Sequence, residues 1–351
     1  MLEIKASQTV KEGSIFGQIS SMDHEQLVVC HDEATGLKAL IGIHNTTLGP
    51  ALGGTRMWPY ATEEEAITDV LRLSRGMTFK NALAGLNLGG GKAVIIGDPK
   101  LKNEAFLRRF GRFVQSLGGR YVTAEDVNMK TSDMEYIAME TKHVTGLPEI
   151  KGGGGDPSPV TAYGTYMGMK AAAKKAFGSD SLSGKKICVQ GVGQVGKYLI
   201  EYLIKEGAEV LITDIFEDKL KKVALDTGAV AIDPNLIYDM DMDIYAPCAL
   251  GATINDDTID RLKCAVIAGG ANNQLKDEAK HGQILLEKGI IYAPDFLINA
   301  GGVINVGAEY FGGYNREIVY KQAEKIYDTC LYILNKSEKE NIPAQQAAIE
   351  A

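Results

Sequence analysis

Two lysines in one glycine-rich stretch have a spacing that could support chemistry. Lys80 and Lys92 lie at the two ends of the segment NALAGLNLGGG. A lysine is usually a solvated surface charge. If both instead face one cleft, they suit an anionic amino-acid substrate, and mutual repulsion together with burial would lower the pKa of one of them. That lysine would then be a neutral amine at working pH and could act as a base.

A glycine motif in the second half of the chain is a candidate nucleotide site. Gly191, Gly193 and Gly196 match the pattern G-x-G-x-x-G. With 40 glycines in 351 residues, chance alone gives roughly 0.5 matches, so the motif identifies nothing by itself. Its context is informative, because the apolar segment KKICVQ precedes it and a predicted helix over 194–205 follows it. Such a turn lets the backbone approach a pyrophosphate, and the helix N-terminus supplies N–H groups and a positive dipole.

An acidic residue follows this motif at a position that bears on the cofactor. Asp214 ends the next predicted strand, AEVLITD, 18 residues after Gly196. Its carboxylate could accept hydrogen bonds from both hydroxyls of an adenine ribose and would repel a 2′-phosphate, although it could also be an ordinary acid at a strand end. We therefore expect NAD rather than NADP, with Gln194 and Val195 of the helix start also at the cofactor.

The segments around the two lysines predict an α/β domain. Residues 25–31 and 37–44 predict two antiparallel strands, and a capping box of Thr62 and Glu65 begins a helix that ends near Asn81. The segment LGPALGGTRMWPY between them predicts a loop. The elements predicted next are a glycine-rich turn running into a buried strand in LNLGGGKAVIIGDP, a helix over 103–117 and a strand in RYVTAED.

A second domain is predicted after the segment KGGGGDPSP, residues 151–159, which is the clearest break in composition. A chain of 351 residues also exceeds the size at which one core usually stops growing. A final amphipathic helix is predicted over 316–337. Five short apolar strands are expected in a parallel sheet: ICVQGVG, AEVLITD, DIYAPCA, CAVIAGG and IIYAPDF.

Charge and composition argue against several classes of protein. The 45 acidic and 37 basic side chains give a net charge of −8, which disfavours a nucleic-acid or anionic-membrane surface. No apolar run reaches the roughly 18 residues of a membrane span, and the start MLEIKASQTVKEGSIF lacks a signal peptide. Because neither a signal-peptide stretch nor a membrane span is found, we expect a cytoplasmic protein. The five histidines lack metal-ligand spacing, so we expect no metal. Five widely separated cysteines are expected to be reduced thiols: Cys30, Cys188, Cys248, Cys264 and Cys330.

Eight sequence blocks, in order between about residues 38 and 320, resemble the glutamate/leucine/phenylalanine/valine dehydrogenase family, and most of all its leucine-type members. They are GPALGGTRMW, LRLSRGMTFKNALAGLNLGGGKAVIIGDP, RYVTAEDV, SPVTAYG, the glycine motif, DIYAPCALGATIN, ANNQL and YAPDFLINAGGVINV. Two departures are a glycine directly before Lys92, where leucine-type members often have alanine, and a somewhat short C-terminus.

The resemblance implies roles for the charged residues. In that family the lysine matching Lys80 binds the substrate α-carboxylate, the lysine matching Lys92 is the catalytic base, and the aspartate matching Asp126 meets the substrate amine and transfers protons. As a lone acid, Asp126 would more simply be a helix cap or a surface charge. The same transfer places Gly53, Gly54, Met77 and Asn273 at the substrate. At the cofactor it places Thr161, beside the nicotinamide, and Asn272, Cys248 and Ala249, the cysteine being expected to pack rather than act as a nucleophile.

The substrate side chain is expected to meet apolar residues. Where glutamate-type members of the family have a lysine and a serine, this chain has Leu52 and Val306. With Ala124 and Val303 they would form an apolar pocket, in which an uncompensated carboxylate would cost on the order of several kcal/mol. An extra methylene changes binding in such a pocket by only about 1–3 kcal/mol, so leucine, valine and isoleucine are expected together.

The resemblance therefore implies NAD-dependent, reversible oxidative deamination of branched-chain L-amino acids to a 2-oxo acid and ammonia. The alternatives are a phenylalanine-type enzyme and a catalytically idle NAD-binding regulator. The expected architecture is a substrate-binding and oligomerisation domain, 1–145, and a Rossmann NAD-binding domain, 146–320, separated by a cleft. Residues 321–351 are expected to pack back on the first domain. A homo-octamer is implied by the resemblance, with no nucleic-acid or membrane partner.

Overall fold

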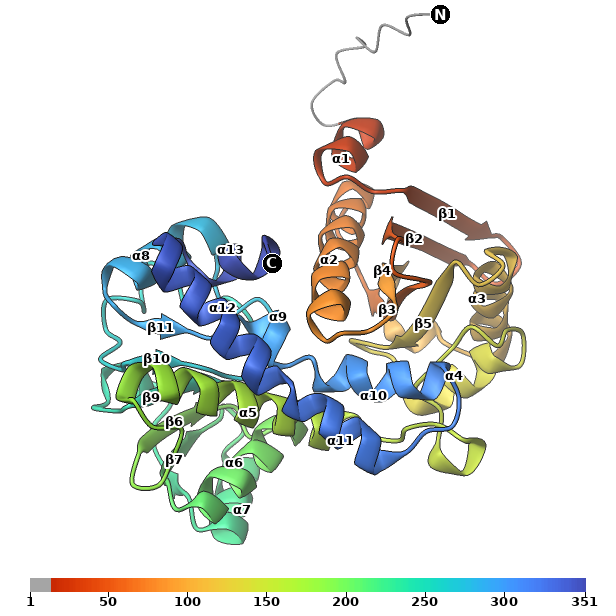
Figure 1. Cartoon of the computed structure of the whole chain (residues 1–351). Helices are drawn as coiled ribbons and strands as arrows, with labels where there is room; N and C mark the ends of the chain where they lie inside the picture. The colour runs from red at the N-terminus through yellow and green to blue at the C-terminus, as the bar shows by residue number, and fades with distance from the viewer. Residues whose placement is uncertain (1–13) are drawn as a thin grey trace, which may run out of the picture. The chain divides into compact units, whose positions relative to one another are not determined.

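The structure is a computed structural model that describes residues 14–351 (Figure 1). The chain forms two compact units, Met1–Ala82 with Asn87–Lys151 and Leu83–Leu86 with Gly152–Ala351. The boundary at 151/152 falls at the start of the predicted glycine-rich junction. The N-terminal segment MLEIKASQTVKEGSIF, in which we expect no signal peptide, lies mostly outside the described residues.

The first unit is built on a five-stranded mixed sheet with the strand order β1-β2-β4-β3-β5. Strand β1 pairs antiparallel with β2, and β2 with β4, whereas β3 is parallel to both β4 and β5. The strands are β1 (Gln26–Asp32), β2 (Leu37–Asn45), β3 (Ala51–Trp58), β4 (Gly89–Ile96) and β5 (Tyr121–Glu125). The helices are α1 (Ile15–Ser21), α2 (Glu63–Leu83), α3 (Glu104–Ser116) and α4 (Thr131–Ala138), with 3-10 turns at Pro99–Leu101 and Glu149–Lys151.

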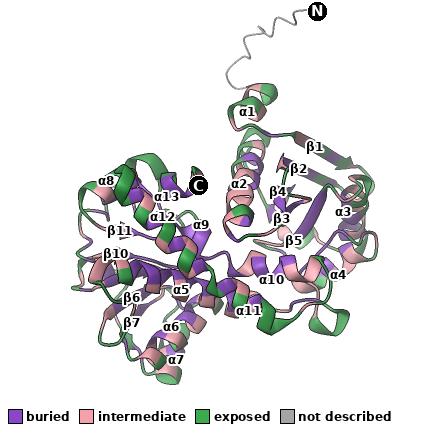
Figure 2. Ribbon diagram, viewed as in Figure 1, coloured by how far each residue is buried: buried purple, intermediate pink, exposed green. Residues whose placement is uncertain are grey.

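Helices cover both faces of this sheet, and Figure 1 shows α2 and α3 on opposite sides of it. Phe106, Phe110 and Val114 of α3 pack against one face. The other face carries Val94 of β4, which packs against Val70 of α2 in a separate apolar cluster. Figure 2 shows buried residues along the strands and on the helix sides that meet them.

The prediction of a loop for LGPALGGTRMWPY is wrong, because most of this segment is the central strand β3. Glycine normally disfavours a strand interior. Here the glycines permit close approach of neighbouring backbones: a Cβ on Gly53 would lie 1.7 Å from the carbonyl oxygen of Gly91, and a Cβ on Gly54 would lie 2.4 Å from that of Glu125. The strand therefore forms because these side chains are absent.

The second unit contains a six-stranded parallel sheet with the order β11-β10-β9-β6-β7-β8. The five predicted strands are present, and the short β8 was not predicted. The strands are β6 (Lys186–Gln190), β7 (Glu209–Thr213), β8 (Val230–Ala231), β9 (Ile244–Pro247), β10 (Val266–Ile267) and β11 (Ile291–Tyr292). Its first helices are α5 (Ser158–Phe177), α6 (Gln194–Glu206), α7 (Glu217–Thr227), a 3-10 turn at Ile237–Asp239, α8 (Glu278–Glu287), α9 (Asp295–Ile298) and α10 (Gly301–Tyr310).

The C-terminal helices differ from the single predicted helix over 316–337. The chain forms α11 (Arg316–Glu324), α12 (Ile326–Glu340) and α13 (Ala344–Ile349). The first break falls at Lys325, whose N–H bonds to the carbonyl of Gln322 and so tightens one turn. The expectation that 321–351 packs on the first domain is also not met: the apolar residues of α12 and α13 lie in the core of the second unit, with those of α5.

Candidate active site

One face of the sheet in the first unit collects most of the predicted substrate residues. Side chains alternate between the two faces of a strand, so Lys92 shares a face with Val94, which packs on α2. By the same alternation Leu52 and Arg56 of β3 lie on this face, and Leu52 is paired in register with Gly90 of the glycine run before Lys92. Leu52 is fully buried, and Ala124 of β5 is 6% exposed.

Lys92 and Asp126 form an ion pair. The Nζ of Lys92 lies 2.8 Å from Oδ2 of Asp126, and the two side chains are 8% and 22% exposed. Burial raises the pKa of Asp126, but the positive charges of Lys92 and Arg56 outweigh it and hold that pKa below its ordinary value. Asp126 is therefore ionised at neutral pH. The structure brings together a buried amine and a carboxylate, the two groups that proton transfer requires.

Glycine at position 54 makes room for this pair. A Cβ there would lie 2.9 Å from the Cβ of Asp126, in addition to its clash with the preceding carbonyl. Asp126 follows directly after the last residue of β5, at the carboxyl end of a strand parallel to β3. The close strand approach thus fixes where the carboxylate sits.

The end of α2 brings further predicted residues to the sheet. Met77 lies with its Cγ 3.2 Å from where a Cβ on Gly53 would be, and Lys80 is one helical turn further on, partly exposed. Asn81, which sequence reasoning used only as a helix end, is fully buried. Its Nδ2 donates to the carbonyl oxygens of Gly89, at 2.6 Å, and Leu52, at 3.4 Å. Asn81 therefore ties the helix to both strands at the site.

The sequence analysis also missed a network of charged side chains that runs from Asp126 through Arg56 to Asp69. The Nε of Arg56 donates to Oδ2 of Asp126 at 3.2 Å, and its Nη1 donates to Oδ2 of Asp69 at 3.1 Å. The hydroxyl of Tyr60 donates to the same oxygen of Asp69 at 2.5 Å. Burial, reinforced by the carboxylate of Asp69, raises the pKa of Tyr60, so its hydroxyl remains a neutral donor. Recognising β3 as a strand would have revealed Arg56, because it alternates with Leu52 and Gly54.

The glycine motif of the second unit has the geometry of a nucleotide-binding turn. Gly191 has φ 104°, in the left-handed region that favours glycine. A Cβ on Gly196 would lie 2.1 Å from the carbonyl oxygen of Gly191, whereas a Cβ on Gly193 would meet nothing within 4 Å. These are the three uses of glycine expected of the motif: a tight turn, an open backbone for the ligand, and close packing of helix on strand.

The start of α6 can hold an anionic ligand. Gly193 caps this helix without a side-chain hydrogen bond, and Gln194 and Val195 are its first residues. The first N–H groups of a helix have no partner within it, and they carry the positive end of its dipole. A pyrophosphate fits the open surface at Gly193.

Asp214, which follows directly after β7, holds the glycine turn. Its Oδ2 accepts from the N–H of Val192, at 2.9 Å, and its Oδ1 accepts from the N–H of Phe216, at 2.9 Å. These bonds fix the carboxylate at the end of the strand. Each oxygen retains a lone pair, so a role toward ribose hydroxyls is compatible with this placement.

The loops after β6, β9 and β10 converge at the carboxyl ends of the parallel strands. A Cβ on Gly191 would lie 2.7 Å from Ala249, and the N–H of Gly270 donates to Sγ of Cys248 at 3.3 Å. Burial raises the pKa of Cys248 to about 11, so the thiol is protonated and unsuited to attack as a nucleophile. The structure agrees with the packing role expected of this cysteine.

The remaining predicted residues of the second unit lie on neighbouring segments. Oδ1 of Asn272 accepts from Nδ2 of Asn299 at 2.7 Å, and Asn273 is exposed with φ 52°. The hydroxyl of Thr161 donates to the carbonyl of Pro157 at 2.9 Å. Val303 and Val306 are on α10, one partly buried and one 9% exposed.

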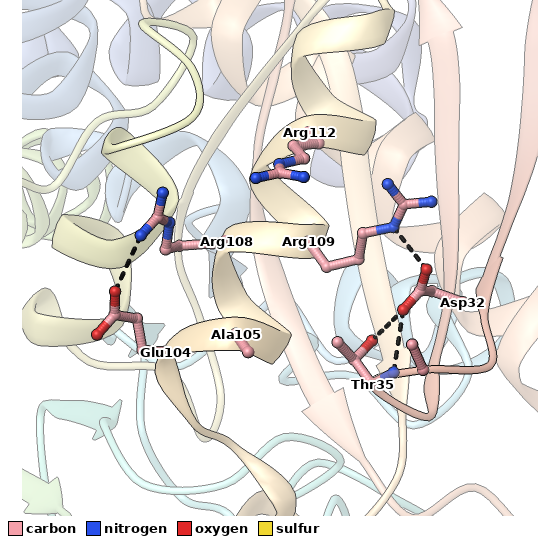
Figure 3. Close-up of a pocket in the computed structure, with 8 residues that line it drawn as sticks. Asp32, Thr35, Glu104, Ala105, Arg108, Arg109 and Arg112 are labelled. Atoms are coloured by element: carbon pink, nitrogen blue, oxygen red, sulfur yellow. Dashed lines mark hydrogen bonds and ion pairs between the residues drawn. The ribbon is translucent and has the colours of Figure 1, made fainter.

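A separate pocket of about 680 Å³ in the first unit contains none of the predicted site residues (Figure 3). Three arginines of α3 line it, and each pairs with a carboxylate: Arg109 with Asp32 at 2.8 Å, and Arg108 and Arg112 with Glu140. Arg108 also pairs with Glu104, so three carboxylates balance the three arginines.

Metal and membrane sites were also sought. Over residues 14–351, no group of three or more histidine, cysteine or acidic side chains is placed to hold a metal ion. Within the same range, no helix has both the length and the apolar character needed to cross a membrane.

Comparisons with known proteins cover almost the whole chain. A family model described as Glu/Leu/Phe/Val dehydrogenase, dimerisation domain, matches residues 24–143, and one described as Glutamate/Leucine/Phenylalanine/Valine dehydrogenase matches 152–215 and 212–351. Leucine dehydrogenase of Bacillus subtilis (strain 168) is 60% identical over 95% of this chain and 92% of its own. Leucine dehydrogenase of Thermoactinomyces intermedius is 59% identical over 95% and 91%. The crystal structure of L-tryptophan dehydrogenase from Nostoc punctiforme aligns with a TM-score of 0.85 and 44% identity, over 96% of this chain and 97% of that one.

Proposed function

Because the chain belongs to the glutamate/leucine/phenylalanine/valine dehydrogenase family, we propose that it catalyses the reversible, NAD-dependent oxidative deamination of leucine, and also of valine and isoleucine. The products are the 2-oxo acid and ammonia. The observation that carries the proposal is the buried pair of Lys92 and Asp126 on a sheet face that also carries Leu52. A catalytically idle regulator would have no use for such a pair.

The residues of the first unit would bind the amino acid and move its protons. Lys80 would pair with the α-carboxylate of the substrate, and Asp126 would accept a hydrogen bond from the substrate amine. The bound nicotinamide would supply the hydride acceptor. Lys92, once neutral, would take a proton from the water that attacks the substrate iminium carbon. Lys92 would pass that proton to Asp126, which would deliver it to the nitrogen of the resulting carbinolamine. Lys92, neutral again, would take the proton of the carbinolamine hydroxyl as the C–N bond breaks, which leaves the 2-oxo acid and ammonia.

The preference for an aliphatic side chain is supported by Leu52 and Ala124. Both are buried, and neither offers a charge or a hydrogen-bond donor. A carboxylate that lost its water beside them would be uncompensated, which disfavours glutamate. Val303 and Val306 are proposed to contribute further apolar surface, and Asn273 to contact the substrate. The names of the two bacillar relatives support leucine among the aliphatic amino acids.

The choice of NAD over NADP is supported by Asp214. Its carboxylate is held at the end of β7 by two backbone N–H groups, beside the open glycine turn. We propose that it accepts hydrogen bonds from the adenine ribose and repels a 2′-phosphate. Thr161 and Asn272 are proposed to hold the nicotinamide half.

The experiment is a rate measurement with a panel of substrates. NADH or NADPH production is followed with leucine, valine, isoleucine, phenylalanine and glutamate, using NAD⁺ and NADP⁺ in turn. We expect the largest kcat/KM with leucine and NAD⁺, with valine and isoleucine within about 100-fold, since a methylene is worth about 1–3 kcal/mol. Preference for phenylalanine would overturn the proposed pocket but not the reaction, and absence of activity with all five would overturn the reaction.

We also propose an assembly and a location for the protein. The description of the matched N-terminal family model as a dimerisation domain supports a homo-oligomer, for which we propose an octamer. The five cysteines are all free thiols, which supports a cytoplasmic location. Multi-angle light scattering of the purified protein tests the assembly, and the mass of a monomer would contradict it.

A further inference from the structure

Arg56 and Asp69 are the part of the charged network to which neither the sequence nor the proposed reaction assigns a task. Lys92 and Arg56 both bind the same oxygen, Oδ2 of Asp126, at 2.8 and 3.2 Å. Arg56 also binds Asp69, so the charges alternate along the network, beginning with Lys92. The side chains of Arg56 and Asp69 are only 24% and 28% exposed, which limits screening by water.

We propose that Arg56 is a positioning residue for the reaction: it shares the Asp126 carboxylate with Lys92 and thereby sets the pH above which Lys92 can act as a base. Asp69 holds Arg56 in place and moderates its charge. This inference rests on the proposed function, since it concerns the role of Lys92 in it.

The need for such a residue follows from electrostatics. A lysine bound to a single carboxylate is stabilised as the ammonium, and an ammonium cannot accept a proton. A second cation on the same carboxylate repels the ammonium form of Lys92. It also weakens the attraction between that ammonium and Asp126. The two contacts to one oxygen place the cationic nitrogens of Lys92 and Arg56 within about 6 Å of each other. At that separation the interaction in a partly buried site corresponds to about 1–2 pH units.

Arg56 is suited to this task because its charge is fixed. Burial lowers its pKa, but the carboxylates of Asp126 and Asp69 more than reverse this and raise it further above the ordinary value. Arg56 therefore carries its charge throughout the working range.

The charged groups facing Asp126 can be named element by element. They are Lys92 on β4 and Arg56 on β3, and Asp69 of α2 acts through Arg56. The hydroxyls of Tyr60, in the loop after β3, and Tyr121, on β5, stay protonated, because burial raises the pKa of both. Glu125 precedes Asp126 but accepts a hydrogen bond from Thr131 at 2.5 Å. Lys80 lies in the last turn of α2 and is left unchanged in every variant below.

The test compares three variants by the pH dependence of kcat/KM for leucine. Arg56→Gln removes the second cation, so we expect the acid limb to move to higher pH by about 1 unit. Asp69→Asn removes the anion that moderates Arg56, so the limb should move the other way, by less. Arg56→Lys keeps the charge and should return the limb toward the wild-type position, even if kcat falls because one ammonium cannot reach both carboxylates.

A purely structural role predicts a different result. In that case Arg56→Gln would lower the rate equally at all pH values, with the acid limb unmoved, and this outcome would overturn the inference. Movement of the limb in the same direction in Arg56→Gln and Asp69→Asn would overturn it too. If Arg56→Gln does not fold, as judged by circular dichroism, Arg56→Lys and Asp69→Asn still test the sign.

A second measurement separates this inference from the proposed function. The rate at which acetic anhydride acetylates Lys92 is followed against pH by peptide mass spectrometry, because only the neutral amine reacts. The midpoint should rise in Arg56→Gln and fall in Asp69→Asn, whatever the substrate. Shifted midpoints in a protein that does not oxidise leucine would refute the proposed function alone. Unshifted midpoints in an active enzyme would refute the inference alone.

Discussion

The candidate sites of the two units consist of different groups: charged side chains in the first unit and backbone groups in the second. In the first unit the site consists of partly buried charges, in which Lys92, Asp126 and Arg56 compensate one another. In the second unit it consists of backbone, where three glycines and a helix N-terminus offer N–H groups and open space. The first depends on the balance of charge and is sensitive to pH. The second depends on the absence of side chains and is sensitive to volume.

Removing the amine of Lys92 should impair the site of the first unit and leave the site of the second unit intact. Lys92→Ala deletes the proposed base but leaves the glycine turn untouched, so we expect kcat to fall at least about 100-fold, the usual scale of general-base catalysis. NADH binding, measured by fluorescence titration, should be unchanged. A variant that retains wild-type kcat would end the assignment of Lys92 as the base.

Two glycines of the motif in the second unit should respond differently to an added side chain. Gly196→Ala places a Cβ 2.1 Å from a carbonyl oxygen and should destabilise the second unit by about 1–3 kcal/mol, as overpacking does. Gly193→Ala meets no neighbour within 4 Å and has an ordinary φ of −65°, so it should fold normally and weaken NAD binding by about 10-fold. Calorimetry and binding titration measure the two effects. Equal melting temperatures for both variants would contradict this interpretation of the turn.

A histidine in the first unit should make the stability of that unit depend on pH. Burial, and then the charge of nearby His44, lower the pKa of His24 from 6.5 to about 4. Its Nδ1 is buried without a hydrogen-bond partner among residues 14–351, so none of these residues accepts a proton there. The unfolded chain binds this proton more tightly, and the stability present above pH 6.5 is lost as the pH falls toward 4. Between pH 7 and 5 the loss should be about 2 kcal/mol.

Urea unfolding followed by tryptophan fluorescence measures this effect selectively. Trp58 is the sole tryptophan of the sequence, and it lies on β3 of the first unit. His24→Gln removes the titrating ring and should flatten the dependence between pH 7 and 5. The same slope in the variant and the wild type would assign the acid sensitivity to other groups.

The sequence predicted the second unit more completely than the first, for a physical reason. Parallel strands are buried on both faces and appear as apolar runs, which is how all but β8 were found. Strand β3 was missed because paired glycines such as Gly53 and Gly54 are typical of loops. The reason for them is the close approach of the backbone at Gly91 and Glu125, which the sequence does not show. Arg56 was lost with that strand. Its partners Asp69 and Asp126 are 13 and 70 residues away, and no local pattern joins them.

The roles of individual residues came from resemblance rather than from pattern. Spacing alone left Lys80 and Lys92 as possible surface charges and Asp126 as a possible cap. The structure adds the ion pair of Lys92 with Asp126, which no periodicity predicts. The C-terminal helices were placed on the wrong domain because an amphipathic stripe shows that a helix is buried but not against which partner.

The adjacent glycines of β3 also bear on how this protein can change over generations. At Gly53 and Gly54 every other amino acid would drive a carbon atom into a neighbouring strand, so selection has no variants to work with there. Leu52, directly before them, has a side chain and can be exchanged for another. If Leu52 contacts the substrate side chain, as we propose, new substrate preferences in descendants of this chain would arise at this position and leave the glycines themselves as they are.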